Sequence, residues 1–175
     1  MSQVSVWFER KFDFSFPVQL RPNLCARLRG TPARLAEMLG SCSDSVLIRK
    51  TQETWSAQEH AGHLLDLEPL WLARVEDYVT ASNQLAVADL TNRKTDEANH
   101  NARPLEPILA EFRAARERLL ERLDELDELI FDRPAIPHPR LKTPMRLVDH
   151  LYFVAEHDDH HLARISQLLQ PSQQA

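Results

Sequence analysis

Several common signatures of function are missing from this sequence. The three glycines, Gly30, Gly40 and Gly62, are spaced too widely for a G-x-G-x-x-G or Walker loop, which excludes Rossmann and P-loop nucleotide chemistry. The two cysteines, Cys25 and Cys42, form neither a C-x-x-C pair nor a disulfide framework, which is typical of reduced thiols in a cytoplasmic protein. No run of about 18 apolar residues occurs, so we expect no membrane-spanning helix.

Excess positive charge is also absent. Lys and Arg together number 21 against 26 Asp and Glu, which gives a formal net charge of −5 with neutral histidines. This balance argues against sequence-independent binding of nucleic acid, which needs a strongly cationic face. With 175 residues, 43% of them hydrophobic and 27% charged, the chain is expected to form one domain with a core of its own. The scarcity of glycine favours a helical domain.

Four segments carry the signals of long helices. Thr31-Pro32 and Thr143-Pro144 each combine a capping residue with a proline at the first helical position. Ser56 and Glu59 form a capping box. The predicted helices span approximately residues 31–42, 56–80, 104–129 and 144–170.

The sequence predicts an all-α four-helix bundle with a segment on either side of it. Residues 1–30 are expected to be an extended or short-helix segment packed on the bundle, and residues 171–175 a flexible tail. The bundle itself is assigned to residues 31–170. Residues 81–103 form a long crossover without clear period, and the three prolines within 131–142 exclude a helix there.

Histidines are concentrated near the C-terminal end of the chain, where four of the eight fall within residues 150–161. On a helical wheel His157 and His161 lie on the apolar stripe with Val154. Their i, i+4 spacing allows two imidazoles of one helix to chelate one cation. His160 is rotated by about 100° from His161 and is expected to point away from such a site.

The other histidines offer fewer constraints. His150 lies about 10 Å along the helix axis from His157, so a core position is expected for it. His100 and His138 lie in polar loops and are expected at the surface. A third ligand would come from His60 or His63 in the second predicted helix, and the wheel does not separate these two. Hydrogen-bonded core histidines without a metal remain the alternative interpretation.

Two short patterns resemble a known family. W-S-x-x-E-x-x-x-H-L-x-D at residues 55–66 and E-H-x-x-H-H-L-A-x-I at residues 156–165 are similar to motifs of the DinB-like (DinB/YfiT) superfamily. The resemblance implies an up-down-down-up four-helix bundle that holds a divalent metal through three histidines. Carried onto this sequence, the implied ligands are His63, His157 and His161.

A three-histidine site leaves the ion with open positions, which is the pattern of catalytic rather than structural metal sites. Nitrogen ligands suit several metals, and zinc or nickel is the expected occupant. Asp158 and Asp66 are candidates for orienting a ligand histidine or accepting a proton. A small-molecule substrate is expected, in a pocket lined by residues 1–30 and 81–103.

Three functions are consistent with this site. The resemblance implies a thiol-dependent S-transferase that adds a low-molecular-weight thiol to a small electrophile. The alternatives are a hydrolase that uses a metal-bound water, and a non-enzymatic metal-binding protein of the stress response. Dependence of turnover on a thiol separates the first from the second.

An apolar face on the second predicted helix favours self-association. Leu65, Leu72 and Val79 extend its apolar surface beyond the stripe that an isolated bundle needs. A second copy of the chain would cover this face, and the resemblance also implies a homodimer. The competing cover is the aromatic N-terminal segment, with Trp7, Phe8, Phe12, Phe14 and Phe16.

Overall fold

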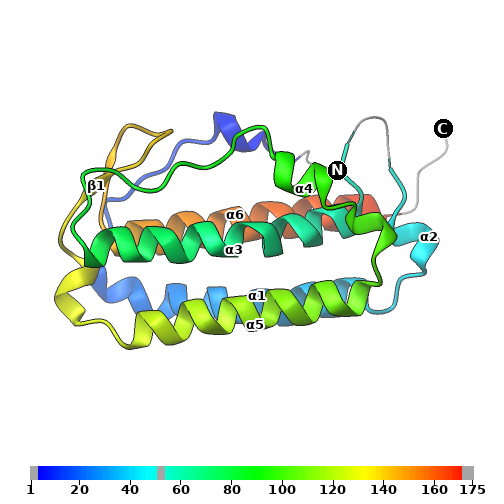
Figure 1. Cartoon of the computed structure of the whole chain (residues 1–175), viewed down its shortest axis with the longest axis horizontal. Coiled ribbons are helices and arrows are strands. Elements are labelled where there is room, and N and C mark those ends of the chain that lie inside the picture. The colour runs from blue at the N-terminus through cyan, green and yellow to red at the C-terminus, as the bar shows by residue number, and fades with distance from the viewer. Residues whose placement is uncertain (1–3, 51–53, 171–175) are drawn as a thin grey trace.

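The computed structural model describes residues 4–50 and 54–170, which form a four-helix bundle (Figure 1). The predicted all-α fold is confirmed. The four long helices are α1 (Arg21–Leu39), α3 (Ala57–Val79), α5 (Leu105–Asp124) and α6 (Leu147–Leu169). The predicted flexible tail lies outside the described residues. None of the described helices has the length and apolarity that a membrane crossing requires.

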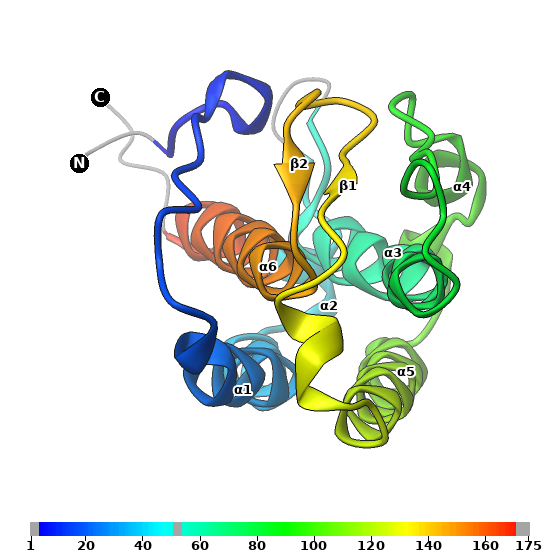
Figure 2. The ribbon, with the colours of Figure 1, turned by 90° about the vertical axis from the view of Figure 1, so that its left-hand side faces the viewer.

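Shorter elements connect these helices. They are α2 (Asp44–Leu47), α4 (Arg93–Glu97), β1 (Ile136–Pro137), β2 (Pro144–Met145) and the 3-10 turns η1 (Trp7–Glu9), η2 (Val18–Leu20), η3 (His100–Ala102) and η4 (Glu128–Phe131). The two strands pair antiparallel and form the only sheet within the described part of the chain (Figure 2).

The helices follow the up-down-down-up order. α1 and α6 run in one direction and α3 and α5 in the other (Figures 1 and 2). Each helix packs against its parallel partner and against one helix of the other pair, α1 against α5 and α3 against α6. Because α3 and α5 are parallel, the chain between them must return along the whole length of the bundle. This return is the 81–103 crossover, whose α4 and η3 pack against α3.

The first bundle helix begins ten residues earlier than predicted. Thr31 and Pro32 lie inside α1, so their interpretation as a helix start is wrong. A proline cannot donate to the carbonyl four residues before it, here that of Leu28. The Arg116 Nη1 donates to this Leu28 carbonyl at 3.1 Å, and the helix continues through the proline.

Two other predicted boundaries also move. Pro144 belongs to β2, and α6 begins at Leu147 after Arg146, whose backbone N–H donates to the Asp149 carboxylate at 2.8 Å. α5 ends at Asp124, several residues short of the predicted end. The start of α3 agrees with the sequence, because Ser56 and Glu59 form the expected reciprocal capping box.

The N-terminal segment lies against α6. Trp7 packs edge-on against Phe153 with ring centroids 5.3 Å apart, and Phe16 packs in the same way against Tyr152 at 5.3 Å. The aromatic segment therefore does not cover the outer face of α3. Leu65 and Leu72 are half-buried against the bundle's own core and Val79 is exposed, so the uncovered face is smaller than expected. The homodimer stays a prediction.

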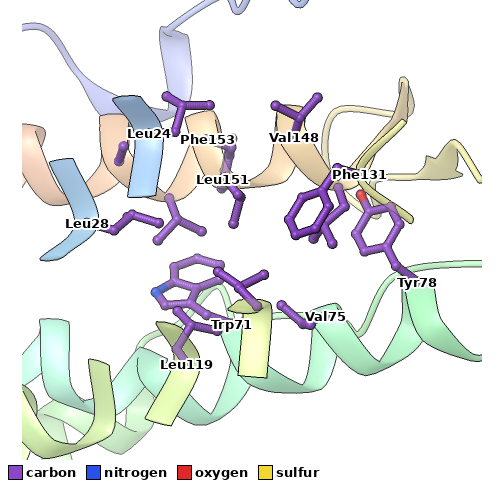
Figure 3. Close-up of a cluster of buried hydrophobic side chains, with 14 of the residues drawn as sticks. Leu24, Leu28, Trp71, Val75, Tyr78, Leu119, Phe131, Val148, Leu151 and Phe153 are labelled. Atoms are coloured by element: carbon purple, nitrogen blue, oxygen red, sulfur yellow. The ribbon is translucent and has the colours of Figure 1, made fainter. Parts of the chain in front are cut away.

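A layer of large side chains fills the bundle at the level of Trp71. Leu28, Trp71, Leu119 and Leu151 bring together one residue from each of the four helices (Figure 3). His150 belongs to this layer as predicted, with its ring 5.7 Å from that of Trp71 and neither ring nitrogen hydrogen-bonded within the described chain. The buried core continues in a second cluster that includes Leu35, Leu64 and Phe112.

Candidate metal centre

Three histidines meet where the first turns of α3 face the second half of α6. One ring nitrogen from each of His63, His157 and His161 lies within 4.8 Å of the other two. The Nε2 atoms of His157 and His161 are 3.1 Å apart. When two nitrogens each lie about 2.1 Å from one ion and the N–metal–N angle is about 90–109°, they are about 3.0–3.4 Å from each other. The spacing of this pair therefore fits a shared cation.

Burial keeps these three rings neutral. It lowers the pKa of His63 to about 4 and the pKa values of His157 and His161 well below their ordinary value. A neutral imidazole has a free lone pair on one nitrogen, which is the form that binds a metal. The donor set therefore suits a divalent ion at neutral pH.

A hydrogen-bonded chain orients His63. Its Nδ1 lies 3.0 Å from the Thr95 hydroxyl, which also bonds to the Asp66 carboxylate. Because the Thr95 hydroxyl donates its hydrogen to a carboxylate, its oxygen can only accept from His63. His63 therefore donates from Nδ1, which leaves the lone pair of its Nε2 free to bind a metal. Asp66 thus acts through Thr95, a residue that sequence reasoning missed.

His60 orients His161 in a similar way. The Nδ1 atoms of these two rings are 2.8 Å apart, while Nε2 of His161 faces His157. His161 therefore donates from Nδ1 to His60, which leaves its Nε2 lone pair directed at the other two histidines. His160 lies outside the group and packs against Trp7 at 5.5 Å.

The histidines form one wall of a cavity of about 300 Å³. Leu67, Leu70 and Trp71 of α3 form its floor, and the remaining walls come from the N-terminal segment, the crossover and the β-hairpin. The crossover and the N-terminal segment contribute as expected from the sequence. An ion bound by the three histidines would be accessible to a small molecule in this cavity, which distinguishes the site from a closed structural one.

Comparisons with known proteins identify the family and match the fold. A model of the DinB superfamily matches residues 27–165. The chain belongs to the DinB superfamily. Among solved structures it is similar to YfiT from Bacillus subtilis, described as a probable metal-dependent hydrolase with an unusual four-helix bundle topology; the TM-score is 0.79 at 22% identity over 91% of each chain. No curated protein matches.

His100 is not at the surface of this DinB-superfamily chain, and that prediction is wrong. Its side chain is 1% exposed, and its Nε2 lies 2.8 Å from the Asp66 carboxylate. The ring lies directly on Gly62, where an added Cβ would be 2.2 Å from two ring carbons. A glycine inside a helix costs about 1 kcal/mol relative to alanine, so Gly62 is the one local signal of this contact in the sequence.

Gly62→Ala is therefore expected to weaken metal binding. The methyl group must displace His100, and with it Asp66 and Thr95, so His63 loses the partner that orients its ring. We expect a drop in Ni²⁺ affinity of about 10–100-fold, measured by isothermal titration calorimetry. Gly30→Ala in α1 is the matched control, since its Cβ would meet nothing closer than Arg34 Nε at 4.0 Å. Equal affinities in the two variants would contradict the role of this hydrogen-bonded chain.

His138 is also buried, at 2% exposure, so its predicted surface position is wrong. It follows β1, and its Nδ1 lies 3.2 Å from the backbone nitrogens of both Arg140 and Leu141. The hairpin places this ring 4.9 Å from Phe153 on α6 and at the wall of the cavity.

The two carboxylates proposed from the sequence have different surroundings. Asp66 is joined to His63 through Thr95, as described above. Asp158 accepts from Arg116 Nη1 at 2.6 Å and from the Thr31 hydroxyl at 2.8 Å. Its carboxylate is thus directed at α1 and α5 and takes part in a buried ion cluster with Arg116 and Glu68.

Proposed function

We propose that this protein binds one divalent metal ion, zinc or nickel, through His63, His157 and His161 and hydrolyses a small molecule in the adjoining cavity. The observation that carries the proposal is the position of the three neutral histidines in the wall of a cavity rather than in a closed shell. The description of YfiT as a probable metal-dependent hydrolase supports the same reaction class.

A divalent ion held by His63, His157 and His161 would supply Lewis-acid chemistry, polarising a substrate carbonyl and lowering the pKa of water in the cavity towards about 7. The chain contributes orientation and the exclusion of bulk water. His60 and Thr95 accept the Nδ1 hydrogens of His161 and His63 and so hold both rings with Nε2 inward. Trp7 and Trp71, with ring centroids 5.1 and 5.5 Å from that of His157, fix the third ring by packing.

Turnover tests this function directly. Zinc- or nickel-loaded protein is incubated with a panel of small esters and amides, with and without a low-molecular-weight thiol, and product is measured by chromatography. We expect metal-dependent hydrolysis without thiol, lost in His161→Gln. Product formed only with thiol, and carrying it, would instead support the S-transferase. Tight metal binding without turnover in either arm would favour the non-enzymatic metal-binding protein.

A further inference from the structure

Two arginines, Arg74 and Arg140, line the cavity away from the histidine group. Arg74 lies about three helical turns along α3 from His63. Arg74, on α3, is 2% exposed, and Arg140 follows the first strand of the hairpin. Neither makes an ion pair with a carboxylate of the described residues, whereas the equally buried Arg116 pairs with both Glu68 and Asp158.

Arg140 Nη2 is buried without a hydrogen-bond partner in the described chain. The one carboxylate among the described residues that line the cavity, Asp89, is exposed and accepts from Thr91 and Arg93. The two guanidinium groups therefore lack a paired carboxylate in the described chain.

His138 adds a further surplus donor between the two arginines. Its Nδ1 faces two backbone N–H groups, so in the neutral ring the hydrogen is on Nε2. Arg74 Nη1 lies 3.2 Å from this Nε2. Burial and the two neighbouring guanidinium groups lower the pKa of His138 to about 3, so the ring is neutral at pH 7. Two N–H donors thus face each other without an acceptor.

Burying a charge without a counter-ion is costly, and a guanidinium binds a planar carboxylate through two parallel hydrogen bonds. Burial lowers the pKa of Arg74 to about 10, which still leaves it charged at pH 7. A carboxylate placed among these groups would offset both charges and accept from His138 Nε2. The surroundings of these three side chains are thus those of an anion site.

We infer that the substrate is a small organic molecule with a terminal carboxylate, which Arg74, Arg140 and His138 bind while its reacting end lies at the three-histidine group. The second half of this statement rests on the proposed function. Leu67, Leu70 and Trp71 line the space between the two ends, so the body of the substrate is apolar. The Trp7 ring is 5.1 Å from the His157 ring and 5.8 Å from the Arg140 guanidinium carbon, so one indole spans most of the distance.

A purely structural role for Arg140 makes a different prediction. Its guanidinium lies 5.2–5.8 Å from the rings of Trp7, Phe8 and Phe153, and such contacts alone stabilise the N-terminal segment. In that case Arg140→Gln would lower stability and leave the affinity for carboxylates unchanged. On our inference the same variant loses the preference for carboxylates, whatever the loss of these ring contacts does to stability.

The test uses benzoate, phenylacetate and 4-phenylbutyrate, each paired with its neutral amide, titrated into metal-free full-length protein by calorimetry. We expect at least one acid to bind ten or more times tighter than its amide. Arg140→Gln and Arg74→Gln should each abolish that difference, while Arg29→Gln, whose side chain is 63% exposed on α1, should preserve it. Equal binding of acids and amides, or an unchanged preference in both cavity variants, would overturn the inference. Tenfold tighter binding of phenylphosphonate than of any acid would overturn the assignment to a carboxylate.

The metal-free arm separates this inference from the proposed function. Arginine-dependent carboxylate binding in a protein that hydrolyses nothing would remove the hydrolase and keep the anion site. Metal-dependent hydrolysis without any preference of acid over amide would remove the anion site and keep the hydrolase.

Discussion

Replacement of His161 by glutamine is expected to lower the affinity for Ni²⁺ by about a hundredfold or more. The change removes one of the three proposed ligand nitrogens and leaves His157 Nε2 without the neighbour that lies 3.1 Å from it. Removing a group that merely orients a ligand already costs about 10–100-fold, so loss of a ligand exceeds this range. His157→Gln and His63→Gln should behave alike, because the group offers one nitrogen from each residue.

Tryptophan fluorescence provides the measurement. All three tryptophans of the chain pack against a proposed ligand: Trp55 is 4.6 Å from His63, and Trp7 and Trp71 are 5.1 and 5.5 Å from His157. A paramagnetic Ni²⁺ ion at the site should therefore quench most of the emission. Ion present at about 100 times its dissociation constant should also add about 2.7 kcal/mol to the free energy of unfolding.

His160→Gln is the matched control, since this residue precedes a proposed ligand in the same helix and lies outside the group. Its titration curve should overlay that of the unchanged protein. Loss of quenching in His160→Gln together with full quenching in His157→Gln would show that the ligand set is wrong.

The sequence predicted the α6 pair because it depends only on local geometry. His157 and His161 are one turn apart, and the apolar residues around them mark the inward face of the helix. The pattern of apolar residues within α3 could not decide between His60 and His63 as the third ligand, because α3 is packed on several sides and both positions are buried. Only the resemblance separated them, and in the structure the unchosen histidine is a partner of His161.

The residues that sequence reasoning misplaced come from segments without periodicity. His100 and His138 reach the site because the crossover and the hairpin fold back onto α3 and α6, and neither segment has a hydrophobic pattern that would show this. Asn92 and Asn99 adopt positive φ angles of 55° and 49°, which are the turns that direct the crossover. The continuity of α1 through Pro32 could not be predicted for a different reason: the Leu28 carbonyl that the proline leaves free accepts from Arg116, a side chain of α5.

Arg116→Met is expected to cost about 3–5 kcal/mol of the free energy of unfolding. The Arg116 side chain is 1% exposed and pairs with Glu68 on α3 and Asp158 on α6, each through an N–O contact of 2.6 Å. It also donates to the Leu28 carbonyl that Pro32 leaves free. Methionine fills a similar volume but leaves two buried carboxylates without a counter-ion and the Leu28 carbonyl without its donor.

Glu68→Gln is the matched control and is expected to cost only about 1 kcal/mol. The cluster contains two carboxylates for one guanidinium, and burial raises the pKa of Glu68, so a neutral side chain at this position is close to the protonated acid. Arg116 retains Asp158 as its counter-ion in this variant. Urea unfolding at pH 7 followed by circular dichroism measures both changes. Equal losses in the two variants would show that the net charge of the cluster does not govern its contribution, and that shape and hydrogen bonding alone hold α1, α3, α5 and α6 together at this level.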